Sequence, residues 1–574
     1  MKSVHRPSGE TIVLRLSELK LPLDHSDAEL SAAVCRRLRL KPEQLRSHVL
    51  VKRSVDARRQ QPIRLVYCLD LELALSAAAE TRLLHRFQHD PHLRPSPDER
   101  YQFVCSVPAA DWSGTRPVVV GSGPCGYFAA LLLAQMGLRP LLLERGQPVK
   151  QRTADTFGFW RGDRPFNPES NAQFGEGGAG TFSDGKLYSQ VSEPRAYGRK
   201  VLEELVAAGA NPEILTLHRP HIGTFKLATV VRGLRSRIEA LGGEVAFERR
   251  VTGLELEPES RAVRAVLLAD GDRIATSAVV LAVGHSARDT FQWLQAGGIA
   301  LEPKPFAMGV RIEHPQPLID AARWGTSAGH PRLAAAEYKL VHHCREPGNL
   351  GRDVYSFCMC PGGLVVGATS EAGAVVTNGM SQHSRNDRNA NSGIVVNVTL
   401  ADLEPYGQGP GDPLAGVAFQ RHWEQRAFVA GGASLRAPAQ RLGDFLAGRS
   451  SAGSPATGEV QPSYQPGVEF TDLTPCLPPF VATAIREALP AFERRLPGFC
   501  RADAVLTGVE TRTSSPVRIP RREDNLESIN TPGLYPAGEG AGYAGGILSA
   551  AIDGIKVAEK MALRLVEQGQ SPTR

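Results

Sequence analysis

The segment GSGPCG and its neighbours have the residue types and the order that a dinucleotide-binding turn requires. A short apolar run, expected as a strand, precedes it, and an apolar segment with the length of a helix follows. A second apolar run then ends at Glu144. Gly121 permits a tight turn, Gly123 lets backbone N–H groups approach a pyrophosphate, and Gly126 lets the helix pack closely on the strand. The unit as a whole predicts a dinucleotide site.

Glu144 stands where a carboxylate can accept hydrogen bonds from both hydroxyls of an adenosine ribose, and its charge would repel a 2′-phosphate. The N-terminus of the expected helix offers positive partial charge to the phosphates. The residues predicted to hold the cofactor in this unit are Gly121, Ser122, Gly123, Pro124, Cys125, Gly126, Glu144 and Arg145.

A second glycine-rich unit, residues 533–551, favours FAD as the cofactor. A short strand is expected at 534–537 and a helix from about Gly546. The unit resembles the C-terminal motif of FAD enzymes of the glutathione-reductase-like class, in which an acid, here Glu539, binds ribitol and pyrophosphate. Open N–H groups at Gly545 and Gly546 would stabilise the negative charge of a reduced flavin. The predicted contacts are Gly538, Glu539, Gly545, Gly546 and Ile547.

Two smaller features fit the same interpretation. Residues 278–284 form an apolar run that ends in Gly284 and resembles the strand that returns the chain to an FAD domain. Val251 matches the position at which such enzymes touch adenine through backbone atoms. The sequence shows no second unit of strand, GxGxxG and helix, so a dedicated nicotinamide-nucleotide domain is not expected. NAD(P)H is expected at most as a transient reductant.

Several segments between residues 100 and 560 carry a family resemblance. Examples are FGEGGAGTFSDGKLYS, FCMCPGG, GVETRTSSPVRIPR and LYPAGEGAGYAGGILSAA. Together they resemble a bacterial family of uncharacterised FAD-dependent dehydrogenases. The resemblance implies a glutathione-reductase-like FAD fold and non-covalent FAD, and it names no substrate.

Residues 174–187 are expected to lie over the flavin. The glycines would let the main chain lie flat against the ring, and two hydroxyls would hydrogen-bond it. A loop folded only for FAD binding, without a catalytic residue, remains the alternative. The predicted contacts in this segment are Gly177, Gly178, Gly180, Thr181 and Ser183.

Three side chains are the catalytic candidates. Lys186 would neutralise charge on reduced flavin or hold an anionic substrate, and Arg512 would serve as a fixed cation. His285 would serve as an acid–base group. A structural salt bridge for Arg512 and a structural, satisfied histidine at position 285 remain open.

The nine cysteines are scattered and form no CxxC pair, which indicates free thiols in a reducing compartment. Cys358 and Cys360 suggest a redox role. One intervening residue would close a strained small ring, so packing within a strand is the favoured interpretation. His342, His343 and Cys344 lack further ligands at helical spacing, and no metal site is expected.

The first hundred residues predict a small α+β unit of order βαββ, with a helix over residues 27–40. Ten Lys or Arg lie between Cys35 and Arg64 against two acids, and such a patch could contact phosphates. No set of aromatic residues for stacking accompanies it. A solvated or docked basic face is therefore favoured over nucleic acid binding.

The chain has 574 residues, of which 42% are hydrophobic and 22% charged, and a net charge of +6 demands no polyanionic partner. No apolar run reaches the length of a membrane span, and the N-terminus lacks the apolar core of a signal peptide, so a cytoplasmic protein is expected. The expected domains are a ferredoxin-like unit over 1–100, an FAD-binding domain over 113–300 and 501–574, and an inserted substrate domain over 301–500.

The predicted fold class is α/β, with a Rossmann-like FAD domain and an inserted α+β domain. The predicted function is that of an FAD-dependent oxidoreductase, a dehydrogenase that transfers hydride through flavin N5 to or from a small organic substrate. An electron donor or acceptor would complete the reaction. Two alternatives remain: a single-component flavin monooxygenase, and a flavin-containing RNA-linked protein that uses the basic N-terminal unit.

Overall fold

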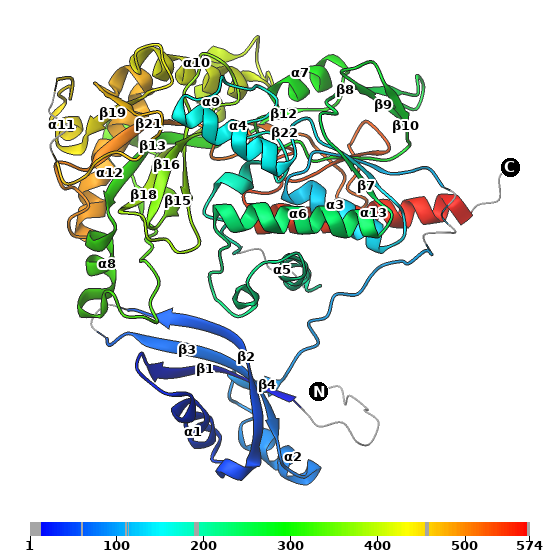
Figure 1. Cartoon of the computed structure of the whole chain (residues 1–574), viewed down its shortest axis with the longest axis vertical. Coiled ribbons are helices and arrows are strands. Elements are labelled where there is room, and N and C mark those ends of the chain that lie inside the picture. Colours follow the sequence, from blue (N-terminus) through cyan, green and yellow to red (C-terminus); the bar gives the residue numbers. More distant parts are fainter. Residues whose placement is uncertain are drawn as a thin grey trace.

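The computed structural model describes residues 13–58, 61–108, 112, 114–188, 195–453 and 458–570. Figure 1 shows the N-terminal unit, in blue, set apart from the rest of the molecule and joined to it by an extended segment. The larger part contains two large sheets, one in each of its two halves, and smaller sheets beside them. Within the described residues, we find no helix whose length and apolar character would let it cross a membrane.

A five-stranded parallel sheet has the strand order β23-β11-β5-β6-β7. Its central strands consist of buried apolar residues, as expected for a parallel sheet with both faces covered. Strands expected from the sequence near residues 118, 141, 279 and 534 are therefore present and adjacent. Their bounds are β5 Val118–Val120, β6 Leu141–Leu143, β7 Glu244–Ala246, β11 Val279–Leu281 and β23 Leu534–Pro536.

Two long helices, α3 and α13, pack together beside this sheet (Figure 1). A Cβ added at Gly554 of α13 would lie 2.2 Å from the carbonyl oxygen of Cys125 in α3, so the two backbones nearly touch. The helices of this half are α3 Pro124–Gln135, α4 Val149–Arg161, α5 Tyr197–Ala207, α6 Thr224–Ala240, α7 Arg288–Ala296 and α13 Ile547–Gln570. A small antiparallel sheet consists of β8 Val251–Leu256, β9 Val263–Leu268 and β10 Arg273–Ala275.

The second half is built on a seven-stranded sheet of order β14-β15-β18-β13-β21-β19-β20. The strands are β13 Phe306–Pro315, β14 Val341–His343, β15 Asp353–Cys360, β18 Asn389–Val398, β19 Ala437–Arg441, β20 Val468–Phe470 and β21 Val505–Glu510. Strand β21 pairs with β13, so this sheet extends past residue 500, where the sequence predicts a domain boundary. The division into domains stays a prediction.

Helices and one of two short strand pairs lie against this second sheet, whereas the other pair contributes Val517 to the apolar core beside the parallel sheet. Its helices are α8 Gln316–Trp324, α9 Leu400–Leu403, α10 Ala415–Ala430, α11 Leu442–Ala447 and α12 Pro479–Arg495. The pairs are β16 Gly363–Gly367 with β17 Thr377–Ser381, and β12 Glu302–Pro303 with β22 Val517–Arg518.

The N-terminal unit is an antiparallel sheet of order β2-β3-β1-β4 with two helices. The predicted βαββ order is present, and the structure adds α2 and β4 to it. The elements are β1 Val13–Pro22, α1 Asp27–Leu38, β2 Leu45–Asp56, β3 Arg64–Leu73, α2 Ala77–Arg86 and β4 Leu93–Pro95. The ferredoxin-like class of this unit stays a prediction.

Part of the basic N-terminal segment contacts the rest of the protein. The Arg53 N–H donates to the Thr216 carbonyl at 2.7 Å, and the His218 N–H donates to the Arg53 carbonyl at 3.0 Å. Arg46 forms a salt bridge with Glu72 within the unit. Some of the predicted basic patch is therefore used in docking and pairing, whereas Arg59 lies outside the described residues.

The contact between α3 and α13 predicts that Gly554→Ala destabilises the protein. The added methyl group has no room beside the Cys125 carbonyl, and overpacking of this kind costs about 1–3 kcal/mol. Urea unfolding measures the change. The matched control is Gly409→Ala, at an exposed position with no atom within 4 Å of the added Cβ. Equal stability of the two variants would contradict the close contact.

Candidate functional site

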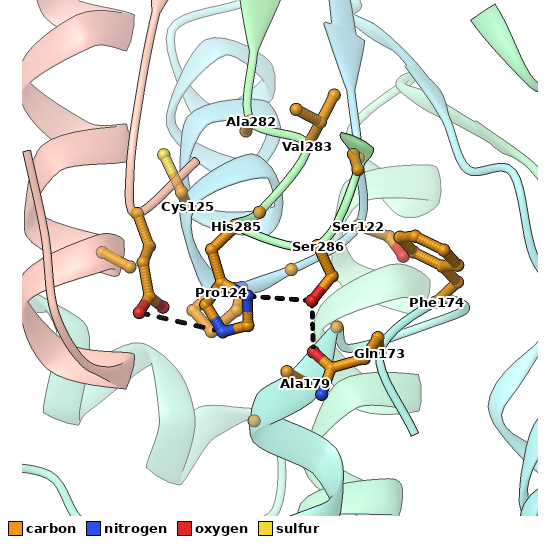
Figure 2. Close-up of a pocket in the computed structure, with 18 of the residues that line it drawn as sticks. Ser122, Pro124, Cys125, Gln173, Phe174, Ala179, Ala282, Val283, His285 and Ser286 are labelled. Atoms are coloured by element: carbon orange, nitrogen blue, oxygen red, sulfur yellow. Dashed lines mark hydrogen bonds and ion pairs between the residues drawn. The ribbon is translucent and has the colours of Figure 1, made fainter. Parts of the chain in front are cut away.

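A cavity of about 390 Å³ lies where the parallel strands β5, β11 and β23 end. Its volume is within the usual range of small-molecule sites, and the carboxyl ends of parallel strands are where open α/β sheets bind ligands. Residues of both glycine-rich units line it, Gly123 from the first and Gly545 from the second. Figure 2 shows part of this lining.

Most of the side chains and glycines predicted from the sequence line this one cavity. They are Gly121, Ser122, Gly123, Pro124, Cys125, Glu144, Arg145, Gly178, Gly180, Ser183, Lys186, Val251, Gly284, His285, Arg512, Glu539, Gly545, Gly546 and Ile547. The structure brings these residues together, and the individual contacts to a cofactor stay predictions. Four predicted residues, Gly126, Gly177, Thr181 and Gly538, are not among the lining residues.

Two of these four residues, both glycines, are required by packing behind the cavity. A Cβ at Gly126 would lie 1.8 Å from the Gly121 carbonyl oxygen, so the helix can follow the turn only with glycine there. Gly538 has a φ of +71° and its N–H donates to the Asp553 carboxylate at 2.7 Å. Both glycines shape the main chain that carries the lining residues.

The glycine-rich segment 174–187 is held by Arg152 of α4, which is fully buried. Its Nη1 donates to the carbonyl oxygens of Glu176 at 2.8 Å and Gly178 at 2.9 Å. The Thr181 hydroxyl donates to the Glu176 carbonyl at 3.3 Å and is buried, and the expected hydrogen bond from Thr181 to a flavin ring stays a prediction. Arg152 is not among the predicted residues, because it lies in a charged stretch without a motif.

Two further residues of this segment have partners within the protein. The Gly177 N–H donates to the Ser122 carbonyl at 3.0 Å, which ties the segment to the first glycine turn. The Ser183 hydroxyl donates to the Gly180 carbonyl at 2.7 Å, although the residue still lines the cavity.

The Glu144 carboxylate is already bound by the chain. One oxygen accepts from the Ser122 N–H at 2.9 Å and from its hydroxyl at 2.6 Å. The other accepts from the N–H groups of Gly146 at 2.9 Å and Gly175 at 3.1 Å. This carboxylate therefore fixes the two glycine-rich segments relative to each other, and its contact with a ribose stays a prediction.

The N-terminus of α13 differs from the expectation in one respect. The Gly545 N–H donates to the Ser549 hydroxyl at 3.3 Å, so it is not the open donor that the sequence predicts. The serine caps its own helix, which begins at Ile547.

A polar chain crosses the cavity wall (Figure 2). His285 Nδ1 contacts the Ser286 hydroxyl at 2.9 Å, and this hydroxyl donates to Gln173 at 3.1 Å. His285 Nε2 lies 4.0 Å from the Glu539 carboxylate. Burial, with the charges of two nearby arginines, lowers the pKa of His285 to about 3, and burial raises the pKa of Glu539 to about 7. At neutral pH His285 is uncharged, and its acid–base role stays a prediction.

Arg512 forms a buried salt bridge, which is one of the two interpretations that the sequence left open. Its Nε and Nη2 donate to the Glu424 carboxylate of α10 at 3.1 and 3.0 Å. Arg288 of α7 donates to the same carboxylate at 2.8 and 2.9 Å. Burial raises the pKa of Glu424, but the two arginines outweigh this and hold it well below its usual range. A catalytic role for Arg512 stays a prediction.

The sequence missed Glu424 and Arg288 because no motif surrounds them and they lie on helices of different halves of the molecule. Only the packing of α7 against α10 makes one carboxylate the partner of two arginines. Glu424 is completely buried, so its charge would strongly destabilise the folded protein without the two arginines.

Lys186 lies at the cavity, where the Asp184 carboxylate offsets part of its positive charge. Its Nζ is 3.1 Å from the Asp184 carboxylate and donates to the Met359 carbonyl. Asp184 also pairs with Arg385. Burial lowers the pKa of Lys186, but Asp184 more than offsets this, so the lysine is a cation at neutral pH.

Outside the cavity, His342 and Cys344 come together with Glu487, which the sequence missed; their potential ligand atoms lie within 4.8 Å of one another. The Glu487 carboxylate accepts from His342 Nε2 at 3.1 Å, from the Arg345 N–H at 2.6 Å and from Asn349 Nδ2 at 2.9 Å. These bonds give the carboxylate a structural role in holding the loop after β14.

Comparison with known protein families identifies two parts of the chain. Residues 305–513 match the family described as "FAD-dependent protein, C-terminal domain-like", and residues 13–72 match a domain of unknown function. An uncharacterised protein from Clostridium beijerinckii is 44% identical over 551 residues, which cover 96% of this chain and 98% of that one. The chain belongs to a bacterial family of FAD-dependent proteins. This confirms the family resemblance and the expected cofactor, FAD.

Solved structures with low similarity include a glycine oxidase and a protein named GidA. Glycine oxidase from Bacillus cereus is 11% identical, with a TM-score of 0.33, over 78% of this chain and 95% of that one. GidA from Aquifex aeolicus is 12% identical, with a TM-score of 0.35, over 80% of this chain and 65% of that one. Scores this low transfer no function to the FAD-dependent protein described here.

The buried pairing of Glu424 predicts a large loss of stability for Glu424→Gln. The substitution removes the carboxylate that the two arginines share. Arg512 loses its counter-charge and Arg288 keeps only Glu371, and breaking a buried ion pair costs about 3–5 kcal/mol. Urea unfolding measures the loss. Glu203→Gln, which breaks a half-exposed pair with Arg199, is the control and should cost under about 1 kcal/mol. Similar losses for both variants would contradict a special role of the shared Glu424 carboxylate.

The raised pKa of Glu539 predicts a pH dependence in the FAD-free protein. Its pKa rises from 4.5 to about 7 on folding, so between these values the folded chain binds the proton more tightly than the unfolded chain. Stability from this group is present below pH 4.5 and is lost as the pH rises to 7, by about 1–3 kcal/mol. Urea unfolding measures the stability across this pH range. The decline in stability should be smaller for Glu539→Gln than for the parent protein, whereas Glu239→Gln, a change at an exposed position, should show the full decline.

Proposed function

We propose that this protein is an oxidoreductase, a dehydrogenase in which FAD in the described cavity exchanges an electron pair with a small organic substrate. The observation that carries the proposal is the shared cavity: two glycine-rich units far apart in sequence line it together with residues of the seven-stranded sheet. The first two groups suit a dinucleotide. The third group, which includes Phe357 and Cys358 of β15, leaves a separate wall for a substrate.

The backbone at the start of α3 fits a pyrophosphate. A Cβ at Gly123 would have no neighbour closer than 4.0 Å, whereas one at Gly178 would lie 2.9 Å from Gly123 Cα. The two glycines thus leave the helix N-terminus free of side chains, and Pro124 begins the helix without an unused N–H. Positive partial charge at this end suits an anion.

The remaining lining residues would hold the two ends of FAD. Val251 and Glu144 would lie toward the adenosine, and Lys186, Glu539 and Ile547 toward the flavin. When bound, FAD supplies the transfer of an electron pair, as hydride through N5, which no side chain of the protein can perform. NAD(P)H would reach the same cavity as a transient reductant.

The protein's own groups would bind the substrate and manage a proton. Glu539, with a pKa of about 7, holds or releases a proton at the cavity near neutral pH, and the uncharged His285 lies 4.0 Å away to relay it. Lys186 provides a cation for a negatively charged substrate or cofactor. The buried Arg512 holds the Ser286 hydroxyl at 3.1 Å and so fixes the polar chain that carries His285.

The proposal predicts that purified protein incubated with FAD turns yellow and retains the cofactor through gel filtration. Gly123→Val should weaken FAD binding at least tenfold, because the new side chain fills the space beside the helix N-terminus. Isothermal titration with FAD measures the affinity. Gly409→Val, at an exposed loop position, is the control and should bind as the parent does. Unchanged binding by Gly123→Val would place the cofactor elsewhere.

A further inference from the structure

Cys358 occupies an unusual position for a packing residue. It lies in β15, lines the cavity, and is half-buried, whereas Cys360 is completely buried. Its φ is +45°, a left-handed conformation that residues with a side chain rarely adopt. Backbone of this kind persists only where the surroundings hold it, and it is concentrated at functional sites.

Two cations hold this strained turn in place. Arg311, fully buried on β13, donates from Nη1 to the Cys358 carbonyl at 2.9 Å. Lys186 donates to the carbonyl of the next residue, Met359. Because both carbonyls are tied down, the Cys358 side chain is placed at the cavity beside Lys186.

The strand is irregular at the CxC pair. A regular strand holds the Cα atoms of residues i and i+2 about 6.8 Å apart, at the upper limit for a disulfide. Here the pairing of β15 with β18 shifts register between Phe357 and Cys360, so the strand is irregular at the pair. The Cys360 thiol donates to the Cys358 carbonyl at 3.3 Å, which brings the two residues into direct contact.

The charges around the pair separate the roles of its two thiols. The hydrogen bond with Cys360, together with the charges of Lys186 and Arg311, lowers the pKa of Cys358 well below that of an ordinary thiol, against burial and the Asp184 charge. The pKa of Cys360 is raised by its bond with Cys358 and by burial. A thiolate at the cavity and a protonated thiol behind it are the arrangement of an attacking and a resolving cysteine.

We propose that Cys358 and Cys360 are a redox-active thiol pair that exchanges an electron pair with FAD in the cavity. In the oxidising direction the two cysteines lose two protons and two electrons, one sulfur–sulfur bond forms, and FAD accepts the pair and both protons to become FADH2. In the other direction FADH2 reduces the disulfide. A small, strained ring is easily reduced, which suits a catalytic rather than a structural disulfide. This inference rests on the proposed function.

Anaerobic reductive titration of the FAD-loaded protein tests the proposal. After mild oxidation with diamide, the parent should take up two electron pairs per FAD from dithionite, one for the cysteine pair and one for the flavin. Cys358→Ser and Cys360→Ser should each take up one, a twofold loss. Cys68→Ser, half-buried on β3 of the N-terminal unit, is the matched control and should keep both pairs.

Peptide mass spectrometry gives a readout independent of activity. In the oxidised parent, the peptide with both cysteines should be lighter by two hydrogen atoms and resist alkylation by iodoacetamide until dithiothreitol is added. If the FAD-loaded parent protein takes up only one electron pair per FAD and both thiols react with iodoacetamide, this proposal is overturned and the proposed function stays intact. A protein that binds no FAD overturns both.

Discussion

The cavity depends on one buried cation. Arg152 binds the carbonyl oxygens of Asn171, Gly175, Glu176 and Gly178 and so gives a glycine-rich segment with little side-chain packing a fixed shape. The Glu144 carboxylate binds the same segment from the other side through the Gly175 N–H. A guanidinium can satisfy several carbonyls at once in a rigid fork, which no apolar side chain could do here. The two charges together hold the segment against the start of α3.

The wall opposite the parallel sheet is fixed by a second set of buried charges. Glu424 of α10 neutralises Arg288 of α7 and Arg512 after β21, so the two halves of the molecule share one carboxylate. Because each of these charges would be costly to bury alone, the halves are stable only in the arrangement that pairs them. The same arrangement places Ser286 and His285 at the cavity. Stability and site geometry therefore have a common cause.

The charged groups at the cavity fall into two kinds: those that are paired within the protein, and those whose pKa is shifted so that they can react. Glu144, Arg512 and Lys186 have partners within the protein and mainly hold their surroundings in place. Glu539 and Cys358 have pKa values shifted toward neutrality or below the usual thiol range, and both lie at the cavity lining. Groups of this second kind can change protonation or bonding during a reaction. The site thus combines a rigid frame with two chemically responsive positions.

The sequence alone determined the features that depend on local order: the strand, glycine turn and helix at residues 118–135, the second glycine-rich unit, and the strands that flank them. Glycine at positions such as 121 and 126 is required by the main chain itself, and so the pattern is visible without a fold. Only the tertiary structure decided which charges pair, that Thr181 faces inward, and that Cys358 meets Lys186 and Arg311. These outcomes depend on contacts between separate segments, 47 positions apart for Arg311 and Cys358 and 136 for Arg288 and Glu424. Neither residue type nor spacing along the chain encodes which distant side chain will fill a given space.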